Sequence, residues 1–164
     1  MVIGYHLIFS TYGFWLPNDP RGSWSDFVRR YELLEFGPAS KVTTRSSLAN
    51  QSHDEKRRQQ AKGALQHKPV RFTGEQAAVV GKSFAMAMRQ GGHVCRACAI
   101  LPDHVHLVMD RTSIRAEQVV RQYKQKATQE LKGAGMLPVD GPPSPWARGC
   151  WKVFLNTPQQ MAKA

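Results

Sequence analysis

Short apolar runs alternate with longer amphipathic segments along the chain, and this pattern predicts strands and helices in a definite order. Residues 2–11 are apolar at nearly every position, which is typical of a central strand. Alternate residues from Tyr5 point to one side of this strand, and those from His6 point to the other. Residues 93–100, 104–110 and 150–156 predict three more strands. The Leu-Pro-Asp turn at 101–103 joins two of them in a hairpin.

Two segments have the spacing of amphipathic helices. The first begins at Thr73, because Thr73 as N-cap and Gln76 three residues later form a capping-box pattern. It ends at the glycine pair 91–92. The second runs over residues 113–132, where apolar residues recur as one stripe that includes Tyr123. Basic and polar residues lie away from this stripe and predict a solvent-facing surface.

The order strand, helix, strand, strand, helix, strand predicts an α+β fold of the ferredoxin-like sandwich type. We expect an antiparallel four-stranded sheet with two main helices on one face, in a single domain over residues 1–164. Residues 12–72 are an irregular basic insertion with a short polar helix at 53–62. Within it, Trp15 and Trp24 would suit base stacking if exposed; alternatively, they anchor the insertion on the core.

The charge of the chain favours a polyanionic partner. Lys plus Arg total 23 and Asp plus Glu total 12, which gives a net charge of +11. The sequence has no apolar run of about 18 residues and no signal-peptide pattern, so we expect no membrane partner. An odd count of three cysteines in a chain with no secretory signal predicts reduced thiols in a cytoplasm.

Cys95 and Cys98 form a C-x-x-C pattern within a predicted strand. A structural zinc site requires further ligands, and the chain has no second such pair. Positions i and i+3 of a strand face opposite sides, so we expect these thiols to be buried small side chains rather than a metal or redox site.

The sharpest local feature is His104-Val105-His106, which follows the predicted turn. Two histidines two residues apart project from one face of a strand. Neutral imidazoles at that spacing suit a divalent metal ion with open positions for phosphate oxygens. Asp103 and Asp110 flank the pair and either help to hold the ion, orient a histidine, or are simply exposed turn residues.

The sequence resembles the HUH-type single-tyrosine transposases, including the REP-associated group. The H-x-H strand with the preceding Leu101-Pro102-Asp103 is similar to the strand for which this family is named. Further similar segments occur in the family's order: Tyr5–Thr11 to the first strand, Lys124–Leu131 to the second helix, and Ser144–Phe154 to the last strand and the loop before it.

The resemblance implies a function in DNA transposition and recombination, in the cytoplasm of a prokaryote and in association with the nucleoid. Members of this family bind imperfect single-stranded DNA hairpins, and a tyrosine hydroxyl attacks the neighbouring phosphate to give a 5′-phosphotyrosine bond. It implies Mg²⁺ or Mn²⁺ at His104 and His106, and a homodimer. We list as candidate DNA contacts Arg21, Trp24, Arg121, Lys124, Lys132, Arg148 and Lys152.

The sequence departs from the family at its C-terminal end. The nucleophilic tyrosine of the family lies on a helix after the last strand, and here Thr157-Pro158 starts such a helix, which we expect to be incomplete. Tyr123 is the remaining candidate for a substitute nucleophile, although its apolar stripe predicts a core position. We therefore expect retained DNA binding and little cleavage. The alternative is a non-catalytic DNA- or RNA-binding module.

Overall fold

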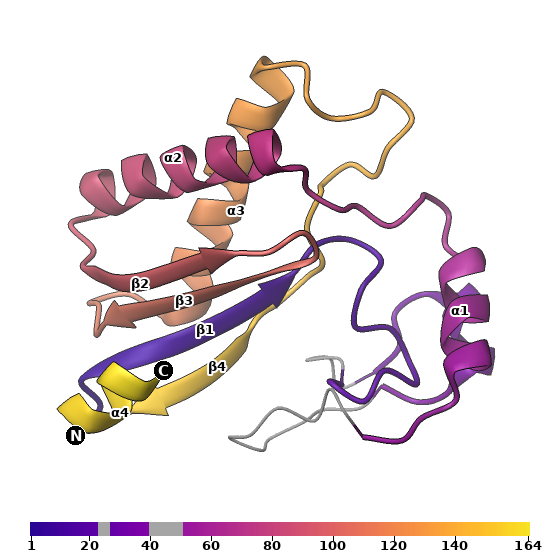
Figure 1. Cartoon of the computed structure of the whole chain (residues 1–164), viewed down its shortest axis with the longest axis horizontal. Coiled ribbons are helices and arrows are strands. Elements are labelled where there is room, and N and C mark those ends of the chain that lie inside the picture. Colours follow the sequence, from indigo (N-terminus) through magenta and orange to yellow (C-terminus); the bar gives the residue numbers. More distant parts are fainter. Residues whose placement is uncertain (23–26, 40–50) are drawn as a thin grey trace.

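One four-stranded antiparallel sheet organises the molecule (Figure 1). The computed structural model describes residues 1–22, 27–39 and 51–164. The sheet contains β1 (Gly4–Ser10), β2 (Cys95–Ile100), β3 (His104–Asp110) and β4 (Trp151–Leu155), in the order β2-β3-β1-β4. This order and the antiparallel pairing confirm the predicted ferredoxin-like arrangement.

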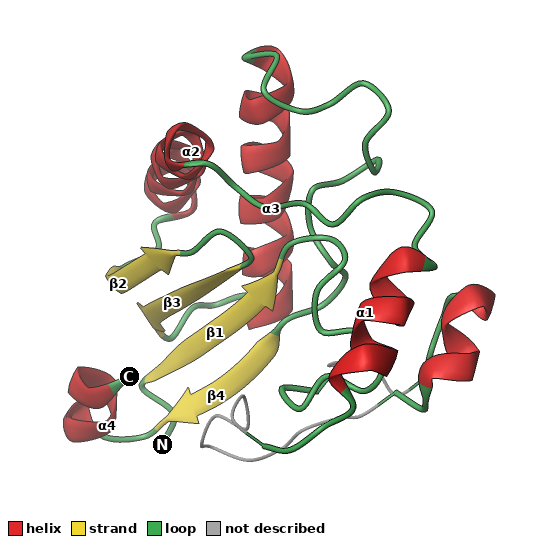
Figure 2. Ribbon diagram, turned by 45° about the vertical axis from the view of Figure 1, so that its right-hand side comes forward, coloured by secondary structure: helices red, strands yellow, loops and turns green. Residues whose placement is uncertain are grey.

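Two long helices cover one face of the sheet, as predicted (Figure 2). They are α2 (Gly74–Gly91) and α3 (Ala116–Gly133). Thr73 caps α2, and its side chain accepts from the backbone N–H of Gln76 in a complete capping box. Helix α3 begins three residues later than predicted, because the N-cap is Arg115 rather than a residue near Ser113.

The core lies between this face and the two helices. The odd-numbered residues of β1 and β3 point into it, and the apolar stripe of α3 packs against them. Its most deeply buried side chains include Leu7, Phe9, Val80, Phe84, Val105, Leu107, Met109, Val119, Tyr123 and Leu131. Burial of each such side chain contributes about 1.5–3 kcal/mol, which makes this layer the main source of stability.

Among the residues that the structure describes, no helix covers the opposite face of the sheet over most of its length (Figure 1). The even-numbered residues of β1 and β3 point to it, so His6, His104 and His106 share this open face. The short α4 (Pro158–Lys163) lies at one end of it, where a Cβ on Gly4 would meet the side chain of Met161.

The insertion after β1 has more structure than the sequence indicated. Helix α1 (Glu55–Gly63) confirms the predicted polar helix, and Asp54 caps it. A 3-10 helix, η1 (Tyr31–Phe36), lies in the stretch predicted to be irregular. Leu33 and Phe36 of η1 pack with Ala61 of α1 in a second, smaller apolar cluster. This cluster packs parts of the insertion against one another, and the insertion lies beside the end of the sheet where β1 finishes (Figure 2).

The prediction for the C-x-x-C pair is wrong in two respects. The pairing of β2 with β3 shifts between Cys95 and Ala97, so Cys95 lies opposite Met109 and Cys98 opposite Leu107. Both partners belong to the helix-covered face, because the β-bulge adds one residue and places both cysteines on the same side. Cys98 is also exposed rather than buried.

No helix within the described ranges is long and apolar enough to cross a bilayer.

Candidate functional site

His104 and His106 lie side by side on the open face of β3. Their ring centroids are 5.0 Å apart. The alternation of a strand produces this placement, because residues two apart project from the same face. Val105 between them is fully buried on the other face, which fixes the orientation of the strand.

A third histidine joins the pair from the neighbouring strand. His6 Nε2 lies 2.9 Å from His106 Nδ1, within hydrogen-bond distance. In the β1–β3 register, His106 pairs with Ile8, so His6 is its diagonal neighbour on the same face. We did not identify His6 as a site residue from the sequence. One sequence signal was available: His6 is on the same side of its strand as Ile8 and Ser10, and these two residues pair with His106 and His104.

An acidic residue and an arginine hold His104. His104 Nδ1 donates to Asp103 Oδ1 at 2.7 Å, and Arg21 Nη1 lies 3.8 Å from Asp103 Oδ2. Burial raises the pKa of Asp103, but the hydrogen bond from His104 and the charge of Arg21 outweigh it and lower the pKa overall. Asp103 therefore stays ionised and fixes the ring and tautomer of His104.

The two imidazoles of β3 can act as electron-pair donors. Burial, together with the neighbouring His104 and His6, lowers the pKa of His106 to about 4, so this ring is neutral at pH 7. The Nδ1 atoms of His104 and His106 are both engaged in hydrogen bonds. When Nδ1 carries the proton, each Nε2 presents a lone pair, and neither has a partner among the described residues.

This donor set fits a divalent ion bound by two protein ligands, with other positions left for water or phosphate. No group of three or more His, Cys, Asp or Glu side chains in the described part of the chain is arranged as a metal site. Asp110 is not available as a third ligand, because it forms a bidentate pair with Arg96. Imidazole suits Mn²⁺ better than Mg²⁺, whose preferred ligands are oxygens.

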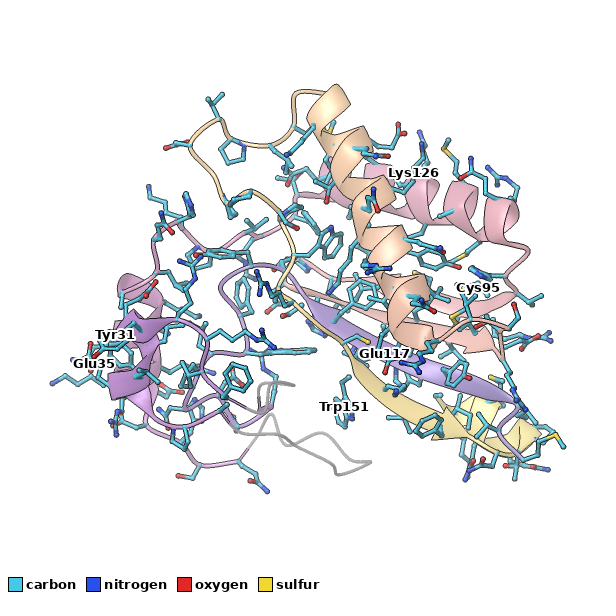
Figure 3. The ribbon with its side chains drawn as sticks, turned by 180° about the vertical axis from the view of Figure 1, so that it is seen from behind. Tyr31, Glu35, Cys95, Glu117, Lys126 and Trp151 are labelled. Carbon is cyan, nitrogen blue, oxygen red and sulfur yellow. The ribbon has the colours of Figure 1, made fainter. Side chains whose placement is uncertain are left out.

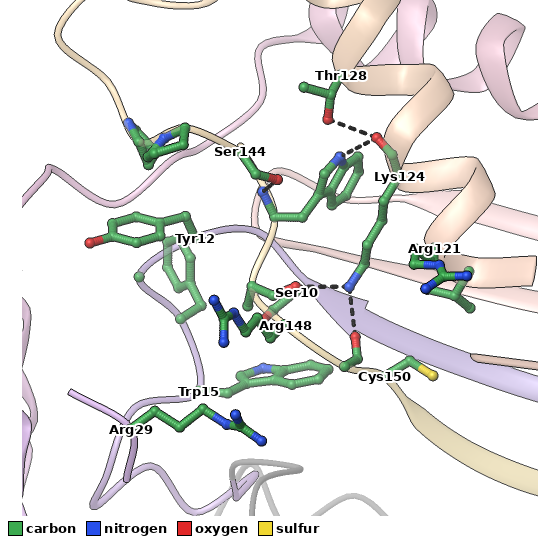
Figure 4. A pocket seen from close by; sticks show the side chains of 18 of the residues that line it. Ser10, Tyr12, Trp15, Arg29, Arg121, Lys124, Thr128, Ser144, Arg148 and Cys150 are labelled. Carbon is green, nitrogen blue, oxygen red and sulfur yellow. Dashed lines mark hydrogen bonds between the residues drawn. The ribbon is translucent and has the colours of Figure 1, made fainter. Parts of the chain in front are cut away.

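Most of the candidate DNA contacts from the sequence line one cleft. The cleft has a volume of about 1110 Å³ and lies between α3, residues 142–150 and two parts of the insertion, residues 12–16 and 27–33 (Figure 4). It is lined by Arg121, Lys124, Lys132 and Arg148. The cleft combines residues more than 100 positions apart, so periodicity along the chain gives no signal for it.

The other candidates have different surroundings. Arg21 forms a bidentate pair with Asp19, and Lys152 pairs with Glu117. Trp24 lies outside the described residues. Glu117 extends from the start of α3 above β4 (Figure 3). The charges of Arg21 and Lys152 are thus partly neutralised inside the protein.

Lys124 acts within the protein as well as lining the cleft. Its ammonium group donates to the carbonyl oxygens of Ala147 and Gly149 at 2.9 and 2.6 Å, which ties residues 147–149 to α3 (Figure 4). Burial lowers the pKa of Lys124 to about 8. By contrast, Arg121 and Lys132 are exposed and form no ion pair with any described residue.

Trp15 lies between the cleft and the histidines. Its ring centroid is 6.3 Å from that of His104, and the Arg21 guanidinium is 6.0 Å from the indole centroid. Its backbone has a φ of 57°, which is unfavourable for a bulky residue. The buried Nε1 has no partner among the described residues, at a cost of about 1–3 kcal/mol. These costs mark Trp15 as more than a simple packing residue.

Tyr123 lies on the other side of the sheet from the histidine pair. It is fully buried on α3, and its hydroxyl group is 2.9 Å from His93 Nδ1. Burial raises the pKa of its phenol well above the usual range. This placement gives no support to a nucleophilic role, because β1 and β3 separate Tyr123 from His104 and His106.

The fold is similar to that of solved transposase structures. A candidate transposase from Deinococcus radiodurans R1 matches with a TM-score of 0.50 and 13% identity, over 99% of this chain and 85% of that protein. A REP-associated tyrosine transposase bound to a REP hairpin matches with a TM-score of 0.49 and 10% identity, over 98% of this chain and 61% of that protein. No protein-family model and no curated protein matches the sequence. The chain thus has a transposase-like fold.

Proposed function

We propose that this protein binds single-stranded DNA beside a hairpin and holds one of its phosphates against a divalent ion at His104 and His106, in a reaction of the transposition class. The observation that carries the proposal is the pair of neighbouring imidazoles with engaged Nδ1 and free Nε2 atoms. A divalent ion bound there would supply Lewis-acid chemistry to a phosphate oxygen. The transposase-like fold agrees with this assignment.

The residues around the pair have defined roles in this proposal. Asp103 and His6 orient the two ligand rings through hydrogen bonds to their Nδ1 atoms. Arg121, Lys132 and Arg148 attract the DNA backbone to the cleft beside the site. The net charge of +11 adds long-range attraction for the same polyanion.

Metal binding is tested by thermal unfolding with and without Mn²⁺. An ion at 100 times its Kd stabilises a protein by about 2.7 kcal/mol, which raises the Tm of a chain of this size by about 5–10 °C. We expect His104→Ala and His106→Ala to abolish this rise. His6→Ala should weaken Mn²⁺ binding by about 10–100-fold, because it removes the hydrogen-bond partner of His106.

His53→Ala is the matched control, because His53 precedes α1 and its Nδ1 lies within hydrogen-bond distance of the Gln51 carbonyl oxygen, not of the histidine pair. It should keep the full response to Mn²⁺. An unchanged Tm of the wild-type protein in saturating Mn²⁺ would exclude the metal site.

DNA binding is tested with a fluorescent hairpin that carries a single-stranded flank. We expect binding at low salt and release as the salt concentration rises, because Lys and Arg displace counterions from the phosphates. An affinity that stays constant between 50 and 500 mM salt (roughly one decade in concentration) would contradict the electrostatic part of the proposal.

A non-catalytic DNA-binding role is the second candidate, and the position of Tyr123 favours it. The hydroxyl group of Tyr123 is buried in the core and bonded to His93. We expect no covalent adduct between this chain and the hairpin through Tyr123 in Mn²⁺, as judged by denaturing gels. An adduct that disappears in Tyr123→Phe would show that the tyrosine reaches the phosphate.

A further inference from the structure

The cleft beside the histidine pair has two unlike walls. The helical wall is the exposed side of α3, with Arg121, Gln125 and Lys132. The facing wall is aromatic and comes from the insertion, with Tyr12, Trp15 and Phe27. Figure 4 shows the Trp15 ring lying along this wall, with Arg148 and Arg29 on either side of it. One such contact is close: the Arg29 guanidinium lies 4.6 Å from the centroid of the Phe27 ring.

The charge of the cleft is strongly positive. The basic residues that line it are Arg29, Arg30, Arg121, Lys124, Lys132 and Arg148, whereas Glu117 is the one acidic residue among the described lining residues. Glu117 is paired with Lys152, which reduces its effect. Arg121, Lys132 and Arg148 form no ion pair with any residue that the structure describes. An anionic ligand is the complementary partner for such a surface.

The size of the cleft exceeds that of a single small-molecule site. Pockets for small ligands measure roughly 300–1,000 Å³, and this cleft measures about 1110 Å³. Cations spaced along a helix and aromatic rings facing them match the repeating phosphates and bases of an unpaired strand. A duplex offers phosphates but no free base faces, because its bases are paired and stacked.

We propose that this cleft binds unpaired nucleotides of the DNA strand, with a base stacked on Trp15 and phosphates bound by Arg121, Lys132 and Arg148. This inference rests on the proposed function and names the part of the DNA that the cleft takes. The cleft lies next to the histidine pair: Trp15, which lines it, has its ring centroid 6.3 Å from that of His104, and Ser10, which also lines it, pairs with His104 across β1 and β3. A strand with one phosphate at His104 thus continues past Trp15 into the cleft.

The experiment compares three oligomers of equal length by fluorescence anisotropy: unpaired oligothymidine, an abasic deoxyribose-phosphate oligomer, and a DNA duplex. Stacking of one base makes binding about tenfold tighter or more. We therefore expect oligothymidine to bind at least about tenfold more tightly than the abasic oligomer. Trp15→Leu should reduce the affinity for oligothymidine to that for the abasic oligomer, with the abasic affinity unchanged.

The phosphate contacts are tested separately by substituting exposed residues of α3. Arg121→Ala and Lys132→Ala should weaken binding of oligothymidine and the abasic oligomer by the same factor. Arg89→Ala and Lys82→Ala are the matched controls, because both residues are exposed on α2 and lie outside the cleft lining. These controls should leave both affinities unchanged.

Equal affinities of the wild-type protein for oligothymidine and the abasic oligomer would overturn the inference. It would also be overturned if the α2 variants lost as much affinity for the oligomers as the α3 variants. Either result leaves the proposed function in place if salt-sensitive DNA binding and the Mn²⁺ response persist. Absence of binding to every oligomer would instead refute the proposed function. If Trp15→Leu shows no cooperative thermal transition, it is not folded and its affinities are not used. The affinities of the wild-type protein for oligothymidine and the abasic oligomer, together with those of Arg121→Ala and Lys132→Ala, then test the inference.

Discussion

Lys124→Met tests the role of a buried ammonium group next to the cleft. In the native protein, Lys124 Nζ donates to the carbonyl oxygens of Ala147 and Gly149 and lies 4.9 Å from the centroid of the Phe9 ring. Methionine keeps most of the length and apolar surface of the side chain. The substitution therefore removes the charge and both hydrogen bonds with little change in packing.

The expected effect at pH 7 is small. Burial lowers the pKa of Lys124 from 10.5 to about 8, which corresponds to about 3 kcal/mol of destabilisation of the charged form at 1.36 kcal/mol for each pKa unit. Methionine removes this penalty but leaves two carbonyl groups without a donor, at about 1–3 kcal/mol each. The two effects nearly cancel at pH 7.

The pH dependence gives a clearer signal. Between pH 8 and 10.5 the unfolded chain retains the Lys124 proton while the folded protein releases it, so the unfolding free energy of the wild type rises with pH relative to the variant. From pH 7 to pH 9.5 this relative gain is about 2 kcal/mol. Subtracting the unfolding free energy of the variant from that of the wild type at each pH removes the contribution of titratable groups that both proteins contain.

Urea unfolding of both proteins at pH 7, 8.5 and 9.5, followed by circular dichroism, measures this difference. Parallel pH profiles for the wild type and Lys124→Met would refute the reasoning, because they would show that Lys124 keeps an ordinary pKa in the folded state.

Three further substitutions test the fold by urea unfolding. Phe84→Ala should destabilise the protein by about 3–5 kcal/mol, because the ring is 1% exposed in the core; a loss under 1 kcal/mol would contradict this. Thr73→Ala should cost about 1 kcal/mol through loss of the α2 cap, and an unchanged midpoint would exclude that role. Gly4→Ala should cost about 1–3 kcal/mol, because its Cβ would lie 2.5 Å from the Met109 carbonyl oxygen. Gly133→Ala, with open space around it, should cost much less.

Local sequence patterns predicted the main elements because their causes are local. The capping box at Thr73 formed as predicted, and β3 spans the predicted residues 104–110. The period of two along that strand also placed His104 and His106 on the same face. The later start of α3 has a local cause too: Arg115 is the N-cap, and its backbone N–H donates to the Gln118 side chain.

The surroundings of each candidate residue could not be predicted in this way. Arg21 and Lys152 have the sequence features of free surface cations, but the fold places Asp19 and Glu117 beside them. Lys124 was predicted to face solvent, and its ammonium group instead bonds residues 147–149. Which cations remain for a ligand depends on segments that are distant in sequence.

The sequence by itself determined the order of the strands and helices and the direction of the side chains along β1, β3 and the apolar stripe of α3, because periodicity and capping involve only neighbouring residues. Tertiary structure alone decided that His6 meets His106 across 100 residues, that a bulge turns Cys98 to the helix-covered face, and that α3 and the insertion enclose a basic cleft. These features depend on strand register and loop packing, which arise only when distant segments bury their apolar surfaces together.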